Sequence, residues 1–184
     1  MTRDELTLLL TKPFRSDFAA REARRAMAED AVALVYESAT RPPPQLPAVL
    51  RERIAFRAAY ILEYLYFHEP DTWLPYRTRF CETDFPACLH AGARRHFAKI
   101  MAHLLREQLP DEATLGRIAE TAAQWAIEPR TKVAVQIWCV EILKLCRPRC
   151  AWVGESWDDL IATLSAEASP AIAARMRNSW RTNR

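Results

Sequence analysis

Hydrophobic residues recur every three or four positions along most of the chain, which is the pattern of amphipathic α-helices. The pattern is clearest in residues 48–68 and 86–107, and we predict a long helix over each range. The apolar face of the first consists of Ile54, Ala58, Ile61, Leu62 and Leu65. That of the second consists of Leu89, Ala93, Phe97, Ile100 and Leu104.

Residues that favour helix ends divide the rest of the chain into further helices. Asp84 and Ser169 are expected to cap helices that have Pro86 and Pro170 in their first turns. The proline-rich segment 41–47 cannot be helical, and a stiff polyproline connector and a docking site for a proline-binding partner are its two interpretations. The remaining helices are expected over residues 3–11, 17–27, 29–39, 71–82, 111–127, 129–146, 155–167 and 170–182.

Short and long helices alternate, and the long ones start near residues 47, 86, 129 and 170, at spacings of 39, 43 and 41. Such a period is typical of HEAT and armadillo repeats. HEAT repeats often carry a basic residue early in the second helix, and Arg57, Arg95, Lys132 and Arg175 occupy similar depths here. We therefore predict one all-α domain over residues 1–184, an α–α superhelix of about four stacked HEAT-like helix pairs. A plain antiparallel bundle is the structural alternative.

The layout also resembles a group of small helical proteins of Bacteroidetes. The similarity lies in residues 56–64, 98–100, 125, 132–135 and 174–176. Some members of this group carry the label adenylosuccinate lyase. That lyase is more than twice as long and has a serine-rich, glycine-containing loop with the catalytic serine, and this chain has no such loop. The resemblance therefore implies a fold and no lyase activity, and the proline-rich segment departs from the layout of the group.

Composition suggests a non-membrane protein without a cofactor. No apolar run approaches the roughly 20 residues that span a bilayer, and no signal-peptide core follows the N-terminus. The 5 cysteines are an odd number, which indicates thiols in a reducing compartment. We therefore expect a cytoplasmic location. His96 and His103 are seven residues apart, but a zinc site would need at least one more nearby ligand, so no metal is expected.

Charge is distributed unevenly between the two sets of helices. The first helices of the pairs sum to −11 and the second helices to +11, although the net charge is only +3. In HEAT-like arrays the second helices line the concave side, so a basic concave surface is one interpretation. Its candidate anion-binding or partner-binding residues are Arg57, Arg94, Arg95, Lys99, Lys132 and Arg175. Neutralisation of the acidic helices by the basic ones across the layer boundary is the other interpretation.

These patterns favour a non-catalytic binding module or scaffold with a protein partner. A nucleic-acid-binding HEAT-like protein is the alternative, because 22 of the 26 basic residues are arginine and arginine suits anion recognition. Glu141 follows Trp138 by three residues, which loosely resembles the site of HEAT-like alkylpurine DNA glycosylases. A salt bridge from Glu141 to Lys144 or to a neighbouring arginine is the competing explanation. No sequence motif points to any other catalysis.

Overall fold

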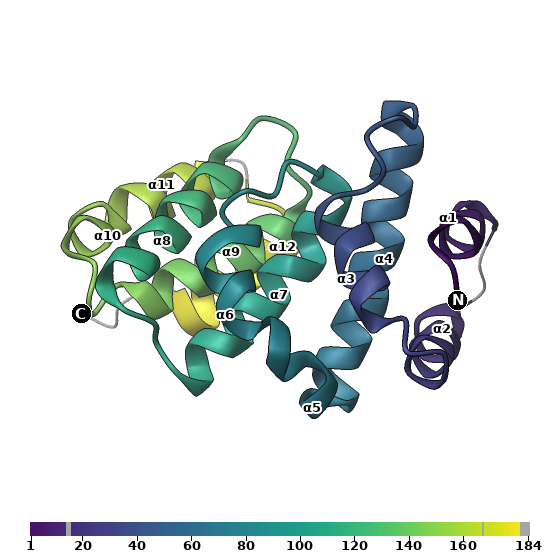
Figure 1. Cartoon of the computed structure of the whole chain (residues 1–184). Helices are drawn as coiled ribbons and strands as arrows, with labels where there is room; N and C mark the ends of the chain where they lie inside the picture. Colours follow the sequence, from purple (N-terminus) through teal and green to yellow (C-terminus); the bar gives the residue numbers. More distant parts are fainter. Residues whose placement is uncertain (14–15, 167, 181–184) are drawn as a thin grey trace. The chain divides into compact units, whose positions relative to one another are not determined.

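The computed structural model describes residues 1–13, 16–166 and 168–180. Within these ranges the regular structure is entirely helical, and helices adjacent in sequence pack in pairs (Figure 1). The chain divides into two compact units, Met1–Ile100 and Met101–Arg184, here called unit 1 and unit 2. None of the helices described in either unit is both long and apolar enough to cross a membrane.

Helix α4 (Ala48–His68) is the centre of unit 1. Helices α1 (Arg3–Thr11), α2 (Phe18–Ala28) and α3 (Val32–Thr40) all pack against it (Figure 1). The first helix begins with a capping box, because the Thr2 hydroxyl accepts from the Glu5 amide at 3.2 Å and the Thr2 amide donates to the Glu5 carboxylate. The bounds of α1 and α4 agree with the prediction from sequence.

The helix expected over 71–82 is broken into short pieces. These are α5 (Pro70–Trp73), the 3₁₀ turn η1 (Leu74–Tyr76), α6 (Arg77–Arg79) and the π-helical turn η2 (Phe80–Asp84). Pro75 has no amide hydrogen, so a regular α-helical hydrogen bond is lost at that point. The buried Trp73 packs edge-on against Phe80 at 5.3 Å between ring centroids, and this contact holds the pieces in the core.

The prediction that Asp84 caps a helix starting near Pro86 is wrong. Helix α7 (Ala91–Glu107) starts five residues later, and its N-terminus is capped from α4 by Glu52, whose Oε2 accepts from the Gly92 amide at 3.1 Å. Asp84 is buried instead and accepts from the Tyr36 hydroxyl at 2.8 Å. Leu89 was expected on the apolar face and is 83% exposed, because it lies before the helix.

Asp84 is also held by two arginines. Arg41 and Arg79 form ion pairs with its carboxylate at 3.2 and 3.0 Å. Burial, together with the hydrogen bond to this carboxylate, raises the pKa of Tyr36, which is therefore a neutral donor at neutral pH. The buried acid thus ties α3 and the residue after it to the π-helical turn.

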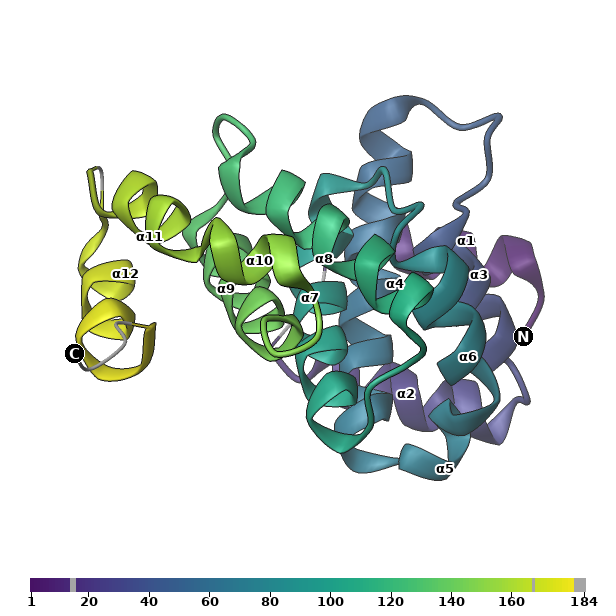
Figure 2. The ribbon, with the colours of Figure 1, turned by 90° about the vertical axis from the view of Figure 1, so that its left-hand side faces the viewer.

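Unit 2 contains α8 (Glu112–Ile127), α9 (Val133–Cys146), α10 (Ala151–Glu155), α11 (Trp157–Ala166), α12 (Pro170–Arg175) and the π-helical turn η3 (Met176–Trp180). Helix α9 packs against α8 and α12, and α11 packs against α10 and α12 (Figure 2). The expected caps are present: Asp111 accepts from the Thr114 amide and Ser169 from the Ile172 amide.

Two helix boundaries in unit 2 differ from the prediction. Helix α9 begins at Val133 and not at Pro129, because Arg130 has φ of 66°, a left-handed conformation that no α-helix can contain. The helix expected over 155–167 corresponds to α11, which begins two residues later, and α10 is an additional short helix that shares only Glu155 with the expected range. Residue 167 and residues 181–184, to which parts of the last two expected helices extend, lie outside the described residues.

All five cysteines are buried thiols, as the sequence indicated. Burial raises the pKa of Cys81 to about 11, that of Cys88 to about 11 and that of Cys146 to about 12. These thiols are therefore protonated at neutral pH and behave as small apolar side chains of the core.

Candidate functional site

Glu63 is a buried carboxylate in the middle of α4 in unit 1. It accepts from His96 Nδ1 at 2.6 Å and from Lys99 Nζ at 2.6 Å, both on α7. The Lys99 ammonium also lies over the Phe67 ring, 4.4 Å from its centroid. Burial acts to raise the pKa of Glu63, but the hydrogen bonds and charges of His96 and Lys99 lower it to about 2. The charge of Lys99 is therefore matched inside unit 1.

His96 is 1% exposed and lies between the rings of Phe56 and Tyr60, with centroids 5.3 Å from each. Burial lowers the pKa of His96 below 6.5, against the opposing effect of Glu63. The imidazole is then neutral at neutral pH and donates its Nδ1 hydrogen to Glu63. Its Nε2 has no hydrogen-bond partner among the described residues, so protonation would place there an N–H that none of them accepts.

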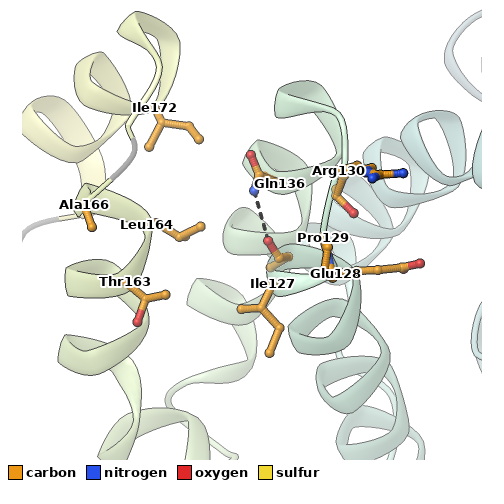
Figure 3. Close-up of a pocket in the computed structure, with 11 residues that line it drawn as sticks. Ile127, Glu128, Pro129, Arg130, Gln136, Thr163, Leu164, Ala166 and Ile172 are labelled. Carbon is orange, nitrogen blue, oxygen red and sulfur yellow. Dashed lines mark hydrogen bonds between the residues drawn. The ribbon is translucent and has the colours of Figure 1, made fainter.

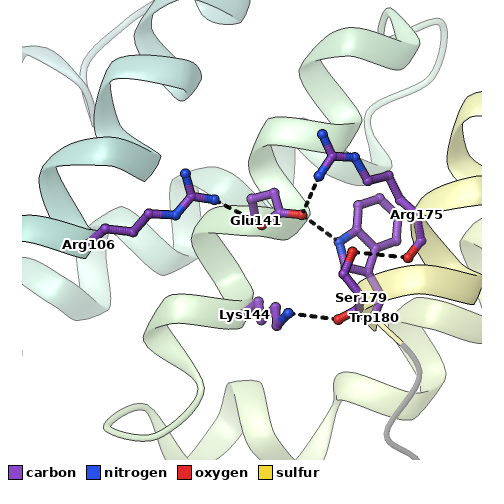
Figure 4. A network of polar contacts seen from close by, with 6 residues as sticks. All are labelled: Arg106, Glu141, Lys144, Arg175, Ser179 and Trp180. Atoms are coloured by element: carbon purple, nitrogen blue, oxygen red, sulfur yellow. Dashed lines mark hydrogen bonds and ion pairs between the residues drawn. The ribbon is translucent and has the colours of Figure 1, made fainter.

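Glu141 is the corresponding buried acid of unit 2, in α9 (Figure 4). Its Oε1 accepts from the Trp180 indole at 2.9 Å and pairs with Arg175 at 3.4 Å, while its Oε2 pairs with Arg106 at 3.2 Å. The predicted salt bridge to a neighbouring arginine is confirmed. Lys144 is not a partner, because it donates to the Ser179 carbonyl at 2.7 Å. Both oxygens of Glu141 are thus occupied by donors.

Arg57 does not belong to an exposed basic surface, which corrects the prediction from sequence. It is 8% exposed, and its guanidinium donates to the carbonyls of Leu10 and Lys12 at the C-terminal end of α1. Burial lowers the pKa of Arg57, and the neighbouring Arg53 lowers it further. A cation at a helix C-terminus opposes the helix dipole, so Arg57 stabilises the packing of α1 on α4.

The other predicted basic residues differ in exposure. Arg94 and Lys99 are half-buried, while Arg95, Lys132 and Arg175 are exposed. Among the described residues, Arg95 and Lys132 have no ion-pair partner.

The ion pairs of Glu63 and Glu141 each join two of the helices that the sequence predicts to be long, here called the long-helix set (α4, α7, α9 and α12). The predicted alternation of short and long helices is wrong in unit 2, because α12 has only 6 residues and α9, with 14, is shorter than α8, with 16. Glu63 of α4 binds Lys99 of α7 in unit 1, and Glu141 of α9 binds Arg175 of α12 in unit 2. The sequence suggested neutralisation between acidic short helices and basic long helices. These two pairs instead lie within the long-helix set. Sequence analysis could have found them from one signal, an acid on an otherwise apolar helix.

Large apolar side chains are exposed at the connections that precede long helices. In unit 1, Val49 in the first turn of α4 is 71% exposed, and Leu89 just before α7 is 83% exposed. In unit 2, Ile127 and Val133 border the α8–α9 turn and are 60% and 36% exposed. Single exposed apolar residues are common, so the two units are described separately. We call Val49 and Leu89 of unit 1 the turn-edge set.

A cavity of about 580 Å³ lies in unit 2 (Figure 3). It is lined by the end of α8, the α8–α9 turn, and residues of α11 and α12. The sequence does not predict this cavity, because a cavity depends on the packing of helices and leaves no local pattern.

Among the described residues there is no group of three or more His, Cys, Asp or Glu side chains that could hold a metal ion.

Comparison with known proteins finds no family model, no curated protein and no solved structure that matches the chain.

Proposed function

We propose that this chain is a non-catalytic binding module that docks a protein partner through the turn-edge set. The observation that carries the proposal is the repeated exposure of large apolar side chains directly before long helices, as at Val49 and Leu89. Apolar side chains outside a core stabilise protein contacts when a partner covers them. The engagement of Lys99 and Arg175 by buried acids also favours a protein partner over a polyanion.

The proposal includes a HEAT-like repeat, arranged as an α–α superhelix. In its favour, the long helices begin at Ala48, Ala91, Val133 and Pro170, which are steps of 43, 42 and 37 residues. HEAT and armadillo repeats have periods of roughly 40 to 47 residues. In such arrays insertions in the repeats lie in loops on one face, which is often the binding face.

The test is capture of a partner from the native cell with the tagged chain. A protein captured by the wild type should be lost with the double variant Val49→Ser, Leu89→Ser. The matched control is Leu8→Ser, Leu74→Ser, which removes two other side chains of unit 1 that are 57% and 62% exposed. Equal capture by both variants, or a monodisperse chain with no co-purifying protein, would contradict the proposal.

Nucleic-acid binding is the second candidate, because Arg95 and Lys132 are exposed and have no ion-pair partner among the described residues. It predicts retention on DNA that weakens steeply with salt and falls when Arg94 and Arg95 are both changed to alanine. Base excision through Glu141 is a further extension of this candidate. Release of modified base from alkylated DNA that is lost in Glu141→Gln would support it, and equal release would exclude it.

A further inference from the structure

The cavity of unit 2 has the size of a small-ligand site and an apolar wall. Its volume of about 580 Å³ lies within the roughly 300–1,000 Å³ of small-molecule pockets. Leu164 of α11 and Ile172 of α12 point from one side toward the end of α8, where Ile127 lies on the other side (Figure 3). Leu164 and Ile172 are almost fully buried, so this wall is held by the core.

Two polar side chains at the cavity, Gln136 and Thr163, present hydrogen-bond acceptors. Gln136 Nε2 donates to the Ala126 carbonyl at 3.2 Å, which fixes the amide and leaves Oε1 directed toward the side of Ile172 (Figure 3). The Thr163 hydroxyl donates to the Asp159 carbonyl at 2.9 Å, so its oxygen offers only lone pairs. The N–H of a bound molecule could therefore donate to either of these two oxygens.

The electrostatic environment of the cavity also favours a hydrogen-bond donor. Residues 126–128 form the C-terminal end of the 16-residue helix α8, where the helix dipole is negative. Arg130 also borders the cavity, but its guanidinium points away from Leu164 and Ile172 (Figure 3). A cationic group is thus favoured at the α8 end of the cavity and an anionic group is disfavoured.

We propose that this cavity binds a small molecule with an apolar body and a primary ammonium group. The apolar body packs against Leu164 and Ile172, and the ammonium donates to Gln136 Oε1 at the negative end of α8. The site does not depend on the proposed docking function, because Val49 and Leu89 do not line the cavity.

The first test compares three probes of one shape: benzylamine, benzyl alcohol and benzoate. We expect a Kd on the order of 1 mM for benzylamine, from the affinity range of ligands of this size. Benzyl alcohol should bind about fivefold more weakly and benzoate at least about tenfold more weakly, measured by NMR titration. Equal affinity for the three probes, tighter binding of benzoate, or no binding of benzylamine would overturn the proposal.

The second test places the ligand in the cavity. Thr163→Trp fills the cavity mouth from an exposed position and should weaken benzylamine at least about tenfold. Ala162→Trp, an exposed neighbour that does not line the cavity, is the matched control and should leave the Kd unchanged. Gln136→Met should remove the preference for the amine over the alcohol and keep the alcohol bound. An unchanged benzylamine Kd in Thr163→Trp would overturn the site. The comparison of the three probes uses only the wild type, so it tests the proposal even if a variant does not fold.

Discussion

Units 1 and 2 each bury one carboxylate in a long helix, and they surround it differently. Glu63 binds a histidine and a lysine, with the imidazole 1% exposed. Glu141 binds two arginines and an indole, and the arginine side chains are 41% and 47% exposed. In unit 1 the buried carboxylate is thus bound by a desolvated histidine, which can titrate, together with a lysine. In unit 2 it is bound by arginines that stay charged and are partly hydrated.

The comparison shows what the charge pattern of the sequence means. A long helix can be basic because it supplies the partners of an acid in another long helix, as α7 does for Glu63 through Lys99. Such a cation contributes to the fold and is less available to an external anion. The excess of positive charge on long helices is therefore weak evidence for a nucleic-acid surface.

Removal of each acid should give the largest loss of stability in its unit. Glu63→Ala should lower the free energy of unfolding by about 3 kcal/mol, because the buried His96 loses its hydrogen bond and Lys99 its ion pair. Glu141→Ala should cost about 2 kcal/mol, since its arginines can regain water. Urea denaturation measures both, with the exposed Glu120→Ala as a control expected within about 0.5 kcal/mol. A larger loss in Glu141→Ala would reverse the comparison.

Substitution of one glycine in each unit tests how closely the helices pack. A Cβ at Gly92 would lie 2.9 Å from the Phe56 Cβ and 3.1 Å from the Glu52 carbonyl oxygen, so α7 approaches α4 closely in unit 1. Gly92→Ala should therefore destabilise the protein by about 2 kcal/mol.

Gly116 of α8 is the matched control in unit 2, where a Cβ would meet nothing within 4 Å. Gly116→Ala should stabilise the protein by about 0.5–1 kcal/mol, because alanine favours a helix interior. Thermal unfolding compares the two variants, and effects of the same sign would contradict the close contact at Gly92.

Acid should weaken unit 1 first. The folded pKa of His96 is lowered below 6.5, so the unfolded chain binds a proton that the folded chain does not. The stability from neutral His96 is complete above about pH 6.5 and is lost as pH falls toward the folded value, by at most about 1.4 kcal/mol per pH unit. Glu63, with its pKa lowered to about 2, adds a loss only below about pH 4.5.

The measurement is urea unfolding at pH 7.5 and 5.5, for wild type and for His96→Gln. The variant should lose most of the difference between the two pH values, because glutamine does not titrate. A wild-type stability that is equal at both pH values would show that His96 is not held neutral. The arginines around Glu141 keep their charge over this range, so their charges contribute no matching change.

Helix existence was predictable from local pattern, but the partners of charged residues were not. Residues 3–11 and 48–68 were placed correctly because their apolar periodicity and end signals agree. Asp84 has the sequence context of an N-cap, yet it is bound by Tyr36, and Glu52 from 40 positions earlier caps α7 instead. Capping by a residue distant in sequence has no local signature.

The residues of the candidate sites also differ in whether the sequence predicts their partners. Glu141 could be assigned an arginine partner from sequence, because an acid on an apolar helix must be paired. The burial of Arg57 could not be predicted, since its partners are the backbone carbonyls at the end of α1. The sequence of α4 would show the same pattern whether Arg57 were buried or exposed. The cavity of unit 2 depends on where α11 and α12 pack, which periodicity does not encode.

Our central prediction is that the cations already engaged inside the fold, which are Arg57, Lys99, Arg106 and Arg175, leave too few unpaired cations among the described residues of these helices to form a nucleic-acid surface. Fluorescence anisotropy with labelled duplex and single-stranded DNA at about 50 and 200 mM salt tests it most directly. We predict no saturable binding tighter than about 100 µM at the lower salt. Micromolar binding that falls at least about tenfold at the higher salt, and that is weakened by Arg94→Ala with Arg95→Ala, would contradict the claim.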